Sequence, residues 1–262
     1  MKVLAIIGSP RKGETYQAVR MVEEQMKQIG RVDFQYLFLK DVHLGQCLGC
    51  HACILSGEDR CPLKDDRASL EQQMMDSDGV IFASPVYSLQ VTALMKNFLD
   101  HFSYLFHRPR FFGKKAMALA TGGGRFKDTL NYLELNARAW GFDPAAKLGV
   151  PHYDGLTPEY RRRTAQAIAD AARRLYASIK ANRLPSPRLR ELIRFRMWKY
   201  TVLAYGNKCD GKYWRDRGWL DKDYYYDSKI GLPKLLCANA IDRLGRHFMK
   251  RVFVEEQEHV EP

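Results

Sequence analysis

Short apolar runs alternate with amphipathic stretches over the first 180 residues, and this alternation constrains the fold more than any other feature. The runs have the length of single strands and lie at 3–8, 34–39, 79–84, 115–122 and 146–150. Between and after them, apolar residues recur at helical spacing, which predicts helices at 15–29, 66–76, 91–106, 127–140 and 158–181. Strands that are apolar throughout and alternate with helices form a parallel sheet covered on both faces.

Crossovers between parallel strands are right-handed, so the predicted five-stranded sheet is doubly wound and its ligand site lies beyond the carboxyl ends of the strands. The loops after the strands are therefore the places to seek function. Residues from about 183 onward exceed what this fold needs. We predict an α/β domain at 1–182 and a basic, aromatic-rich helical extension at 183–262.

The loop after the first strand, GSPRKGET at 8–15, has the composition of a phosphate-binding turn. Its glycines permit tight turns, and backbone N–H groups at a helix start point toward a bound anion. The hydroxyl and basic side chains available there are Ser9, Arg11, Lys12 and Thr15. A polar turn with a helix N-cap is the alternative, because the loop matches neither the Walker A order nor G-x-G-x-x-G.

Two further loops at the same edge have features of a ligand site. SPVYSLQ at 84–90 holds a proline that stiffens the turn, and Tyr87, whose flat face suits a heteroaromatic ring. ATGGG at 120–124 lets the backbone approach a ligand closely. Either loop alone could be an ordinary surface turn, but three such loops at one edge together favour a ligand with a phosphate and a ring.

GSPRKGET, SPVY before a helix that contains LMKNFLD, and ATGGG together resemble the NADPH-dependent FMN reductase branch of the flavodoxin-like superfamily, over about residues 1–180. The resemblance implies a flavodoxin-like fold, FMN as the cofactor, NAD(P)H as an electron donor, and a homodimer or homotetramer. It places the FMN phosphate near Ser9, Arg11, Lys12, Gly13 and Thr15. It places the flavin ring against Pro85, Val86, Tyr87 and Ser88, with Thr121, Gly122 and Gly123 on the other side.

Two residues of this implied site need separate expectations. Tyr87 is the residue expected to tune the flavin ring directly, and packing alone is the alternative role. Glu14 departs from the small or amide residue that the family usually has at its position. Since its carboxylate would repel a phosphate, we expect it to face solvent.

A loop after the second strand holds four of the six cysteines, Cys47, Cys50, Cys53 and Cys61, in the spacing C-x2-C-x2-C-x7-C. Closely spaced thiolates of this kind can reach different irons of one cluster. The pattern resembles that of the iron–sulfur flavoproteins, a subgroup of the same branch, which implies a [4Fe–4S] cluster on these four residues.

Two other readings of the cysteine loop stay open. Zinc is less favoured, because zinc sites usually pair two C-x2-C units a dozen or more residues apart, although His51 could replace a thiolate. The loop could also hold thiols without a metal. Cys209 and Cys237 lie far from the motif in the sequence, and each is expected to be an ordinary buried or partly buried thiol.

The extension should contain two helices. A linker with two prolines at 183–188 precedes a predicted basic helix at 188–205 with apolar residues on one face. The aromatic-rich segment at 212–227 is predicted to be irregular. A second helix is predicted at 232–253, with Leu236, Ala240, Leu244 and Phe248 at four-residue steps.

The net charge of +12 favours anionic partners. An acidic, ferredoxin-like redox protein is one such partner, and contact of the extension with an anionic membrane is a less favoured one. No nucleic-acid motif is present, so nucleic acid is not expected. The N-terminal segment predicts a first strand rather than a signal peptide, and the expected location is the cytoplasm.

The predicted function is an FMN-dependent oxidoreductase of iron–sulfur flavoprotein type. It would pass electrons between a ferredoxin-like one-electron donor or NAD(P)H and a small acceptor. A cluster-free NAD(P)H-dependent FMN or quinone reductase is the alternative enzyme, and a flavodoxin-like electron carrier is the alternative of another class. No catalytic side chain is expected, because the chemistry is centred on the flavin.

Overall fold

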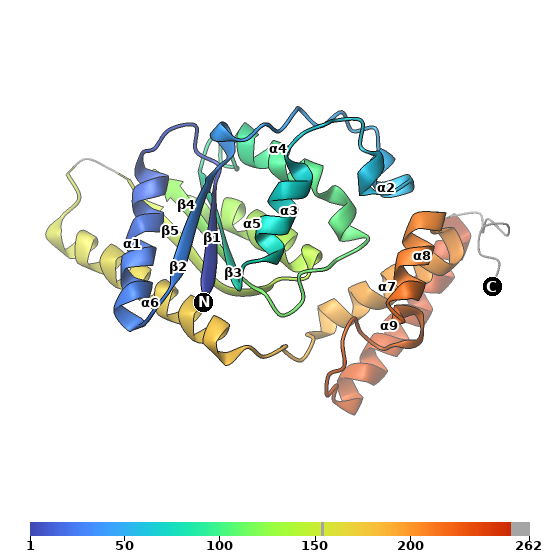
Figure 1. Ribbon diagram of the computed structural model, residues 1–262. Helices are drawn as coiled ribbons and strands as arrows, with labels where there is room; N and C mark the ends of the chain where they lie inside the picture. The colour runs from blue at the N-terminus through green and yellow to red at the C-terminus, as the bar shows by residue number, and fades with distance from the viewer. Residues whose placement is uncertain (153–154, 253–262) are drawn as a thin grey trace. The chain divides into compact units, whose positions relative to one another are not determined.

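The computed structural model describes residues 1–152 and 155–252. The chain divides into two compact units (Figure 1). Unit 1 contains Met1–Gly49 and Leu63–Arg183, and unit 2 contains Cys50–Pro62 and the residues from Leu184 onward. The boundary proposed from the sequence at 182/183 did not anticipate that the segment Cys50–Pro62 groups with the extension.

Unit 1 alternates strands and helices along the chain. Its strands are β1 (Lys2–Ile7), β2 (Asp33–Phe38), β3 (Gly79–Pro85), β4 (Lys115–Gly122) and β5 (Asp143–Pro151). Its α-helices are α1 (Glu14–Ile29), α3 (Arg67–Met75), α4 (Ala93–His101), α5 (Phe126–Trp140) and α6 (Pro158–Ala181). Two short 3-10 helices, η1 (Leu39–Asp41) and η3 (Ser103–Phe106), complete the unit. The predicted α/β class with a five-stranded parallel sheet is confirmed.

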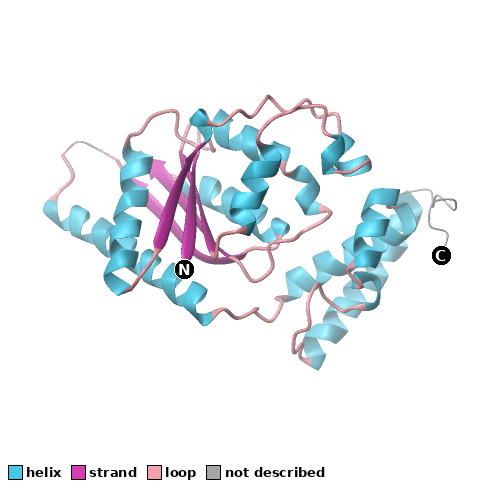
Figure 2. Cartoon of the chain, in the orientation of Figure 1, coloured by secondary structure: helices cyan, strands magenta, loops and turns pink. Residues whose placement is uncertain are grey.

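The sheet, magenta in Figure 2, has the strand order β2-β1-β3-β4-β5, and every neighbouring pair is parallel. This is the flavodoxin-like doubly wound order, in which the direction of winding reverses between β1 and β3. Ligands of such sheets bind at the carboxyl ends of the strands next to this reversal. The fold therefore brings the loops after β1, β3 and β4 to one edge.

Helices cover both faces of the sheet because its strands are apolar on both sides. On one face, α1 and α6 pack against alternate residues of the strands, and Val22 and Leu175 are fully buried there. The opposite face is covered by α3, α4 and α5. Phe82 lies at its centre, with its ring 6.5 Å from that of Phe98 and 5.8 Å from that of Trp140.

Strand β5 begins before the predicted strand at 146–150, because a proline near its start is untypical of strands. Pro144 cannot donate a hydrogen bond to a neighbouring strand, but β5 lies at the sheet edge, where a proline is tolerated. The register shifts between Ala116 and Met117 at the same place. The predicted helix at 91–106 is instead α4 followed by η3.

Unit 2 is helical. It contains α2 (Ala52–Leu55), η2 (Glu58–Arg60), α7 (Leu189–Tyr205), α8 (Lys208–Asp216), η4 (Trp219–Asp221) and α9 (Leu232–Val252). Both predicted extension helices are present, and residue 253 lies outside the described residues. The segment predicted to be irregular contains most of α8. The sequence missed this helix because aromatic and charged residues, not an apolar stripe, dominate it.

The core of unit 2 is aromatic. Phe195 of α7 is fully buried and stacks on Trp214 of α8 at 5.5 Å between ring centroids. Tyr225 packs edge-on against both Phe195 and Trp219. Burial raises the pKa of the Tyr225 hydroxyl well above its usual range. This cluster holds α7, α8 and the following turn together.

Helix α9 exposes the two leucines that the sequence places at four-residue steps along it. Leu236 is 65% exposed and Leu244 is 72% exposed, whereas Ala238 and Asp242 are buried. Asp242 pairs with Arg246, whose guanidinium lies 5.0 Å from the centre of the Tyr200 ring. The small and polar face of α9 therefore packs within unit 2. The side chain of Phe248 lies outside the described residues. Among the described helices, none is long and apolar enough to cross a membrane.

Candidate functional site: a cleft at the carboxyl edge of the sheet and a cysteine loop

A cleft of about 460 Å³ opens at the carboxyl edge of the sheet, where the three predicted loops meet. Ten of the predicted cofactor residues line it: Ser9, Arg11, Lys12, Gly13, Thr15, Pro85, Val86, Tyr87, Thr121 and Gly122. Ser88 and Gly123 do not line it and are exposed. Glu14 and His152 line it as well.

The first loop is held in place by main-chain contacts with its neighbours. The Gly8 N–H donates to the carbonyl of Ala83 at 2.8 Å, and the Gly8 carbonyl accepts from the Thr92 hydroxyl at 2.5 Å. A Cβ at Gly8 would lie 2.7 Å from the Met95 Cβ, so only glycine fits between β1 and α4. The buried Ser9 hydroxyl donates to the Arg11 carbonyl at 2.8 Å and closes the turn.

The amino end of α1 is suited to an anion. Its N-cap is Gly13, and within the described residues no side chain caps its first-turn N–H groups. Uncapped N–H groups at a helix start carry partial positive charge and bind phosphates. Arg11 and Lys12 precede this end, and both are exposed. The Lys12 ammonium lies 4.8 Å from the centre of the Phe38 ring.

Thr15 and Thr121 join the first loop to the end of β4. Both are buried, and their hydroxyl oxygens lie 2.7 Å apart. Gly122 follows with a φ of 152°, and a Cβ on it would lie 3.4 Å from the Val86 Cβ. The loops after β3 and β4 therefore approach each other closely beside the cleft.

The loop after β3 makes a tight turn. Tyr87 and Gln90 exchange main-chain hydrogen bonds at 2.9 and 3.0 Å, and Ser88 and Leu89 between them both have positive φ. Non-glycine residues adopt this conformation at a cost of about 1–2 kcal/mol each. Tyr87 is 44% exposed and lines the cleft. Its ring is therefore accessible to a ligand.

Glu14 and His152 make a side-chain contact that the sequence did not predict. Glu14 Oε2 lies 3.1 Å from His152 Nδ1, and both side chains are about half exposed. The Glu14 side chain is about half exposed but also lines the cleft beside His152, so it does not face solvent alone as expected. His152 lies just past β5, two residues after the predicted strand end at 150, but the loop after this strand was not among the three singled out from the sequence.

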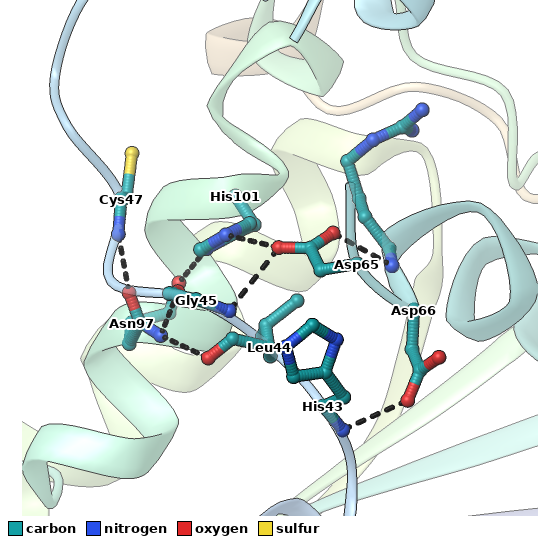
Figure 3. A network of polar contacts seen from close by, with 9 residues as sticks. His43, Leu44, Gly45, Cys47, Asp65, Asp66, Asn97 and His101 are labelled. Atoms are coloured by element: carbon teal, nitrogen blue, oxygen red, sulfur yellow. Dashed lines mark hydrogen bonds and ion pairs between the residues drawn. The ribbon is translucent and has the colours of Figure 1, made fainter. Parts of the chain in front are cut away.

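The start of the cysteine loop is fixed to α4 by Asn97 (Figure 3). The Cys47 N–H donates to Asn97 Oδ1 at 2.9 Å, and Asn97 Nδ2 donates to the Gly45 carbonyl at 2.8 Å. The Asn97 side chain thus supplies hydrogen-bond partners to two main-chain groups of the loop, which in the described part of the chain has no neighbouring strand or helix turn to supply them. Nothing in the sequence distinguishes Asn97 beyond its place in the predicted helix.

A buried aspartate extends this network. Asp65 Oδ2 accepts from the Gly45 N–H at 3.2 Å and lies 3.1 Å from His101 Nε2 (Figure 3). The other ring nitrogen of His101 lies 2.9 Å from the Asn97 carbonyl. Asp66 accepts from the His43 N–H at 2.8 Å. The chain segments before and after the cysteine loop are therefore tied together by side chains of unit 1.

The six cysteines are thiols rather than disulfides in the described part of the chain. Of the four loop cysteines, Cys50 is exposed and the others are half-buried. Cys47 belongs to unit 1, while Cys50, Cys53 and Cys61 belong to unit 2. Four thiols are the donor set that an iron–sulfur cluster requires. Among the described residues, no three His, Cys, Asp or Glu side chains form a ready metal-binding group.

Comparisons with known proteins were made for the sequence and for the fold. The family model for NADPH-dependent FMN reductase matches residues 1–133. An iron–sulfur flavoprotein of Archaeoglobus fulgidus is 28% identical over 225 residues, 84% of this chain and 100% of that protein. A second one from the same organism is 36% identical over 100 residues, 38% of this chain and 48% of that protein. The second alignment thus spans about half of the relative.

Solved structures agree on the fold. The crystal structure of RosB with a bound intermediate, 8-demethyl-8-formylriboflavin-5'-phosphate, matches with a TM-score of 0.55 at 12% identity. The match covers 88% of this chain and 92% of that chain. At this identity the likeness shows a shared fold.

The strand order and the sequence relatives together define an FMN-dependent oxidoreductase with a flavodoxin-like fold. The chain belongs to the NADPH-dependent FMN reductase family. Its resemblance to the iron–sulfur flavoproteins within that family is confirmed by the relatives it matches.

Proposed function

We propose that this protein passes electrons between a one-electron donor or NAD(P)H and a small acceptor, through FMN and a [4Fe–4S] cluster. The observation that carries the FMN part is the cleft, in which hydroxyls, two cationic side chains and an uncapped helix start lie beside an accessible tyrosine. FMN takes up electrons as a hydride pair and can release them singly.

Each wall of the cleft has a proposed task. Ser9, Arg11, Lys12, Gly13 and Thr15 would bind the phosphate, because they surround the amino end of α1. Pro85, Val86 and Tyr87 would lie against the flavin ring, and Thr121 and Gly122 would close the other side. Ser88 and Gly123 would act through their backbones at the rim, since neither lines the cleft itself. Tyr87 is proposed to tune the ring.

The cluster is proposed on Cys47, Cys50, Cys53 and Cys61. Their spacing, their state as thiols and the names of the relatives support it. Within the chain, Asn97 would hold the first of these ligands through its main-chain N–H. Zinc and a metal-free loop are the competing states.

Partners and location are also proposals. The exposed leucines of α9 are a surface that a homodimer or homotetramer could cover. The basic balance favours an acidic, ferredoxin-like donor over a membrane surface. The cytoplasm stays the expected location.

The deciding experiment is an absorption spectrum of anaerobically purified protein, with iron, acid-labile sulfide and flavin measured on the same sample. About one flavin, four irons and four sulfides per chain are expected if the full proposal holds. Flavin without iron, after attempted reconstitution, would favour the cluster-free NAD(P)H-dependent reductase. A sample that binds no flavin would overturn the enzymatic proposal.

Electron donors are then compared on the same protein. Steady turnover with NADPH and slow reduction by ferredoxin would favour the cluster-free reductase. Fast reduction by ferredoxin supports the cluster enzyme. A protein that is reduced but turns over no quinone, oxygen or metal-ion acceptor would favour the electron-carrier alternative.

A further inference from the structure

Glu14 lies in the cleft although its charge opposes the anion that the cleft is proposed to bind. It is the first residue of α1, directly after the N-cap Gly13, and its side chain lines the cleft together with Arg11 and Lys12. A carboxylate at the amino end of a helix is favourable by itself, but beside a phosphate it repels a like charge. A second group that offsets the charge of Glu14 would therefore favour the entry of an anion.

His152 lies where it can offset this charge. Its Nδ1 is 3.1 Å from Glu14 Oε2, which is within hydrogen-bond distance, and its side chain lines the same cleft. The main chain of His152 is held in place, because its N–H donates to the carbonyl of Gly122 at 2.9 Å. Gly122 is the last residue of β4. The histidine therefore joins the end of β4 to the carboxylate at the start of α1.

The charge balance of the cleft shows what this contact can do. The charged and titratable side chains that line the cleft with His152 are Arg11, Lys12, Glu14 and Tyr87. Within this set, Glu14 supplies the negative charge that opposes a phosphate. An imidazole can donate its Nδ1 proton to a carboxylate in the neutral form, and it adds a positive charge when protonated. In both forms the hydrogen bond holds the Glu14 carboxylate at His152, and the protonated form also cancels its charge.

We propose that His152 is a positioning residue that binds the Glu14 carboxylate and thereby lets the cleft accept a flavin with a phosphate. This inference rests on the proposed FMN site and deepens it. It adds a residue from the end of β5, outside the three loops to which the proposed FMN contacts belong. Riboflavin has the same ring as FMN but no phosphate, so the proposed role predicts an effect on FMN alone.

The first test measures the dissociation constants of FMN and riboflavin by quenching of flavin fluorescence, on full-length protein freed of bound flavin. We expect His152→Ala to weaken FMN binding about three- to tenfold, because the Glu14 carboxylate then lies unscreened beside the phosphate. Riboflavin binding should stay at the wild-type value. His247→Ala replaces an exposed histidine of unit 2 and is the matched control, which should bind both flavins as the wild type does.

The second test asks whether His152 acts through Glu14. Glu14→Gln removes the negative charge and keeps the shape of the side chain. In this background His152→Ala should no longer weaken FMN binding, so the double variant should bind FMN at least as tightly as the wild type. A merely structural role of His152 would not be restored by Glu14→Gln. Urea unfolding midpoints show whether each variant is folded.

The outcomes separate this inference from the proposed function. If His152→Ala weakens FMN and riboflavin equally, or leaves FMN binding unchanged, the role of His152 is overturned while the FMN site stands. A loss of FMN affinity that persists in the Glu14→Gln background overturns it too, because His152 then does not act through Glu14. A wild-type protein that binds neither flavin overturns the proposed function and this inference together.

Discussion

The hydroxyl oxygens of Thr15 and Thr121 lie 2.7 Å apart and join the start of α1 to the end of β4. Both side chains are buried, so water cannot replace the partner that one hydroxyl loses when the other is removed. We expect Thr121→Val to lower the free energy of unfolding by about 1–3 kcal/mol and to weaken FMN binding. Urea unfolding and quenching of flavin fluorescence measure the two effects.

The double variant Thr15→Val/Thr121→Val is the control for this prediction. It removes both polar groups, so it should lose less stability than the sum of the single variants. Strict additivity would show that the two hydroxyls do not interact in solution.

Gly8 and Gly13 are both in the first loop but should respond differently to alanine. At Gly8 the new Cβ would lie 2.7 Å from the Met95 Cβ, whereas at Gly13 no atom of the described chain lies within 4 Å. We expect Gly8→Ala to lower the free energy of unfolding by about 1–3 kcal/mol. Gly13→Ala should cost less, about 0.5 kcal/mol, because there alanine is only a poorer N-cap and meets no close neighbour. Urea unfolding midpoints of both variants test this difference. Equal losses of unfolding free energy would contradict the packing argument.

Asn97→Ala should loosen the start of the cysteine loop. It removes the acceptor for the Cys47 N–H and the donor to the Gly45 carbonyl, at a cost of about 1–3 kcal/mol in unfolding free energy. If the loop binds a cluster, the iron retained after gel filtration should fall while flavin content stays constant. Asp100→Asn, near the end of the same helix, is the control and should keep its iron. A loss of flavin in step with iron would point to general unfolding instead.

Glu134 should make unit 1 sensitive to acid. Burial alone would raise the pKa of its carboxyl, but hydrogen bonds from Lys147 and Arg138 outweigh burial and lower it. A carboxyl whose pKa is lower in the folded state than in the unfolded state stabilises the fold at pH values above its unfolded-state pKa. This stabilisation is lost as the pH falls through the folded-state pKa. Glu134→Gln should therefore lose less stability than the wild type between about pH 5 and pH 3.

Urea midpoints at a series of pH values measure this difference. Glu24→Gln is the control, because Glu24 is exposed and pairs only with Arg20 on the same helix among the described contacts. If Glu134→Gln follows the wild type over the whole range, the pair with Lys147 and Arg138 contributes nothing to acid stability.

The doubly wound parallel sheet could be predicted because apolar strands and crossover handedness depend on local pattern, whereas the order of its strands is known only from the structure. Strand β4 has the predicted bounds, while the start of β5 was missed, since Pro144 suits only an edge strand and edge position is a property of the whole sheet. Three loops could be predicted to meet because parallel strands end at the same edge, and the family resemblance then implied the ten residues that line the cleft.

What the sequence could not predict depends on contacts between distant segments. His152 reaches Glu14, and Asn97 reaches Cys47, across intervals that carry no pattern. The exposure of Leu236 and Leu244 on α9 could not be predicted, because spacing shows which residues share a face, not whether that face has a partner. The sequence could not show, for the same reason, that Cys209 lies beside Gly57 or that Cys237 is exposed, so the expectation of a buried or partly buried thiol is wrong for Cys237.

The division of unit 2 between two distant chain segments sets an order of events during synthesis. The segment Cys50–Pro62 leaves the ribosome well before α8, because all of Leu63–Arg183 is translated in between. At about 5–20 residues per second, this delay is on the order of ten seconds. Through that interval the nascent cysteines lack the helix that later packs on them. The cysteine loop is therefore made in an incomplete setting, and its contact with α8 can form only after α8 has left the ribosome.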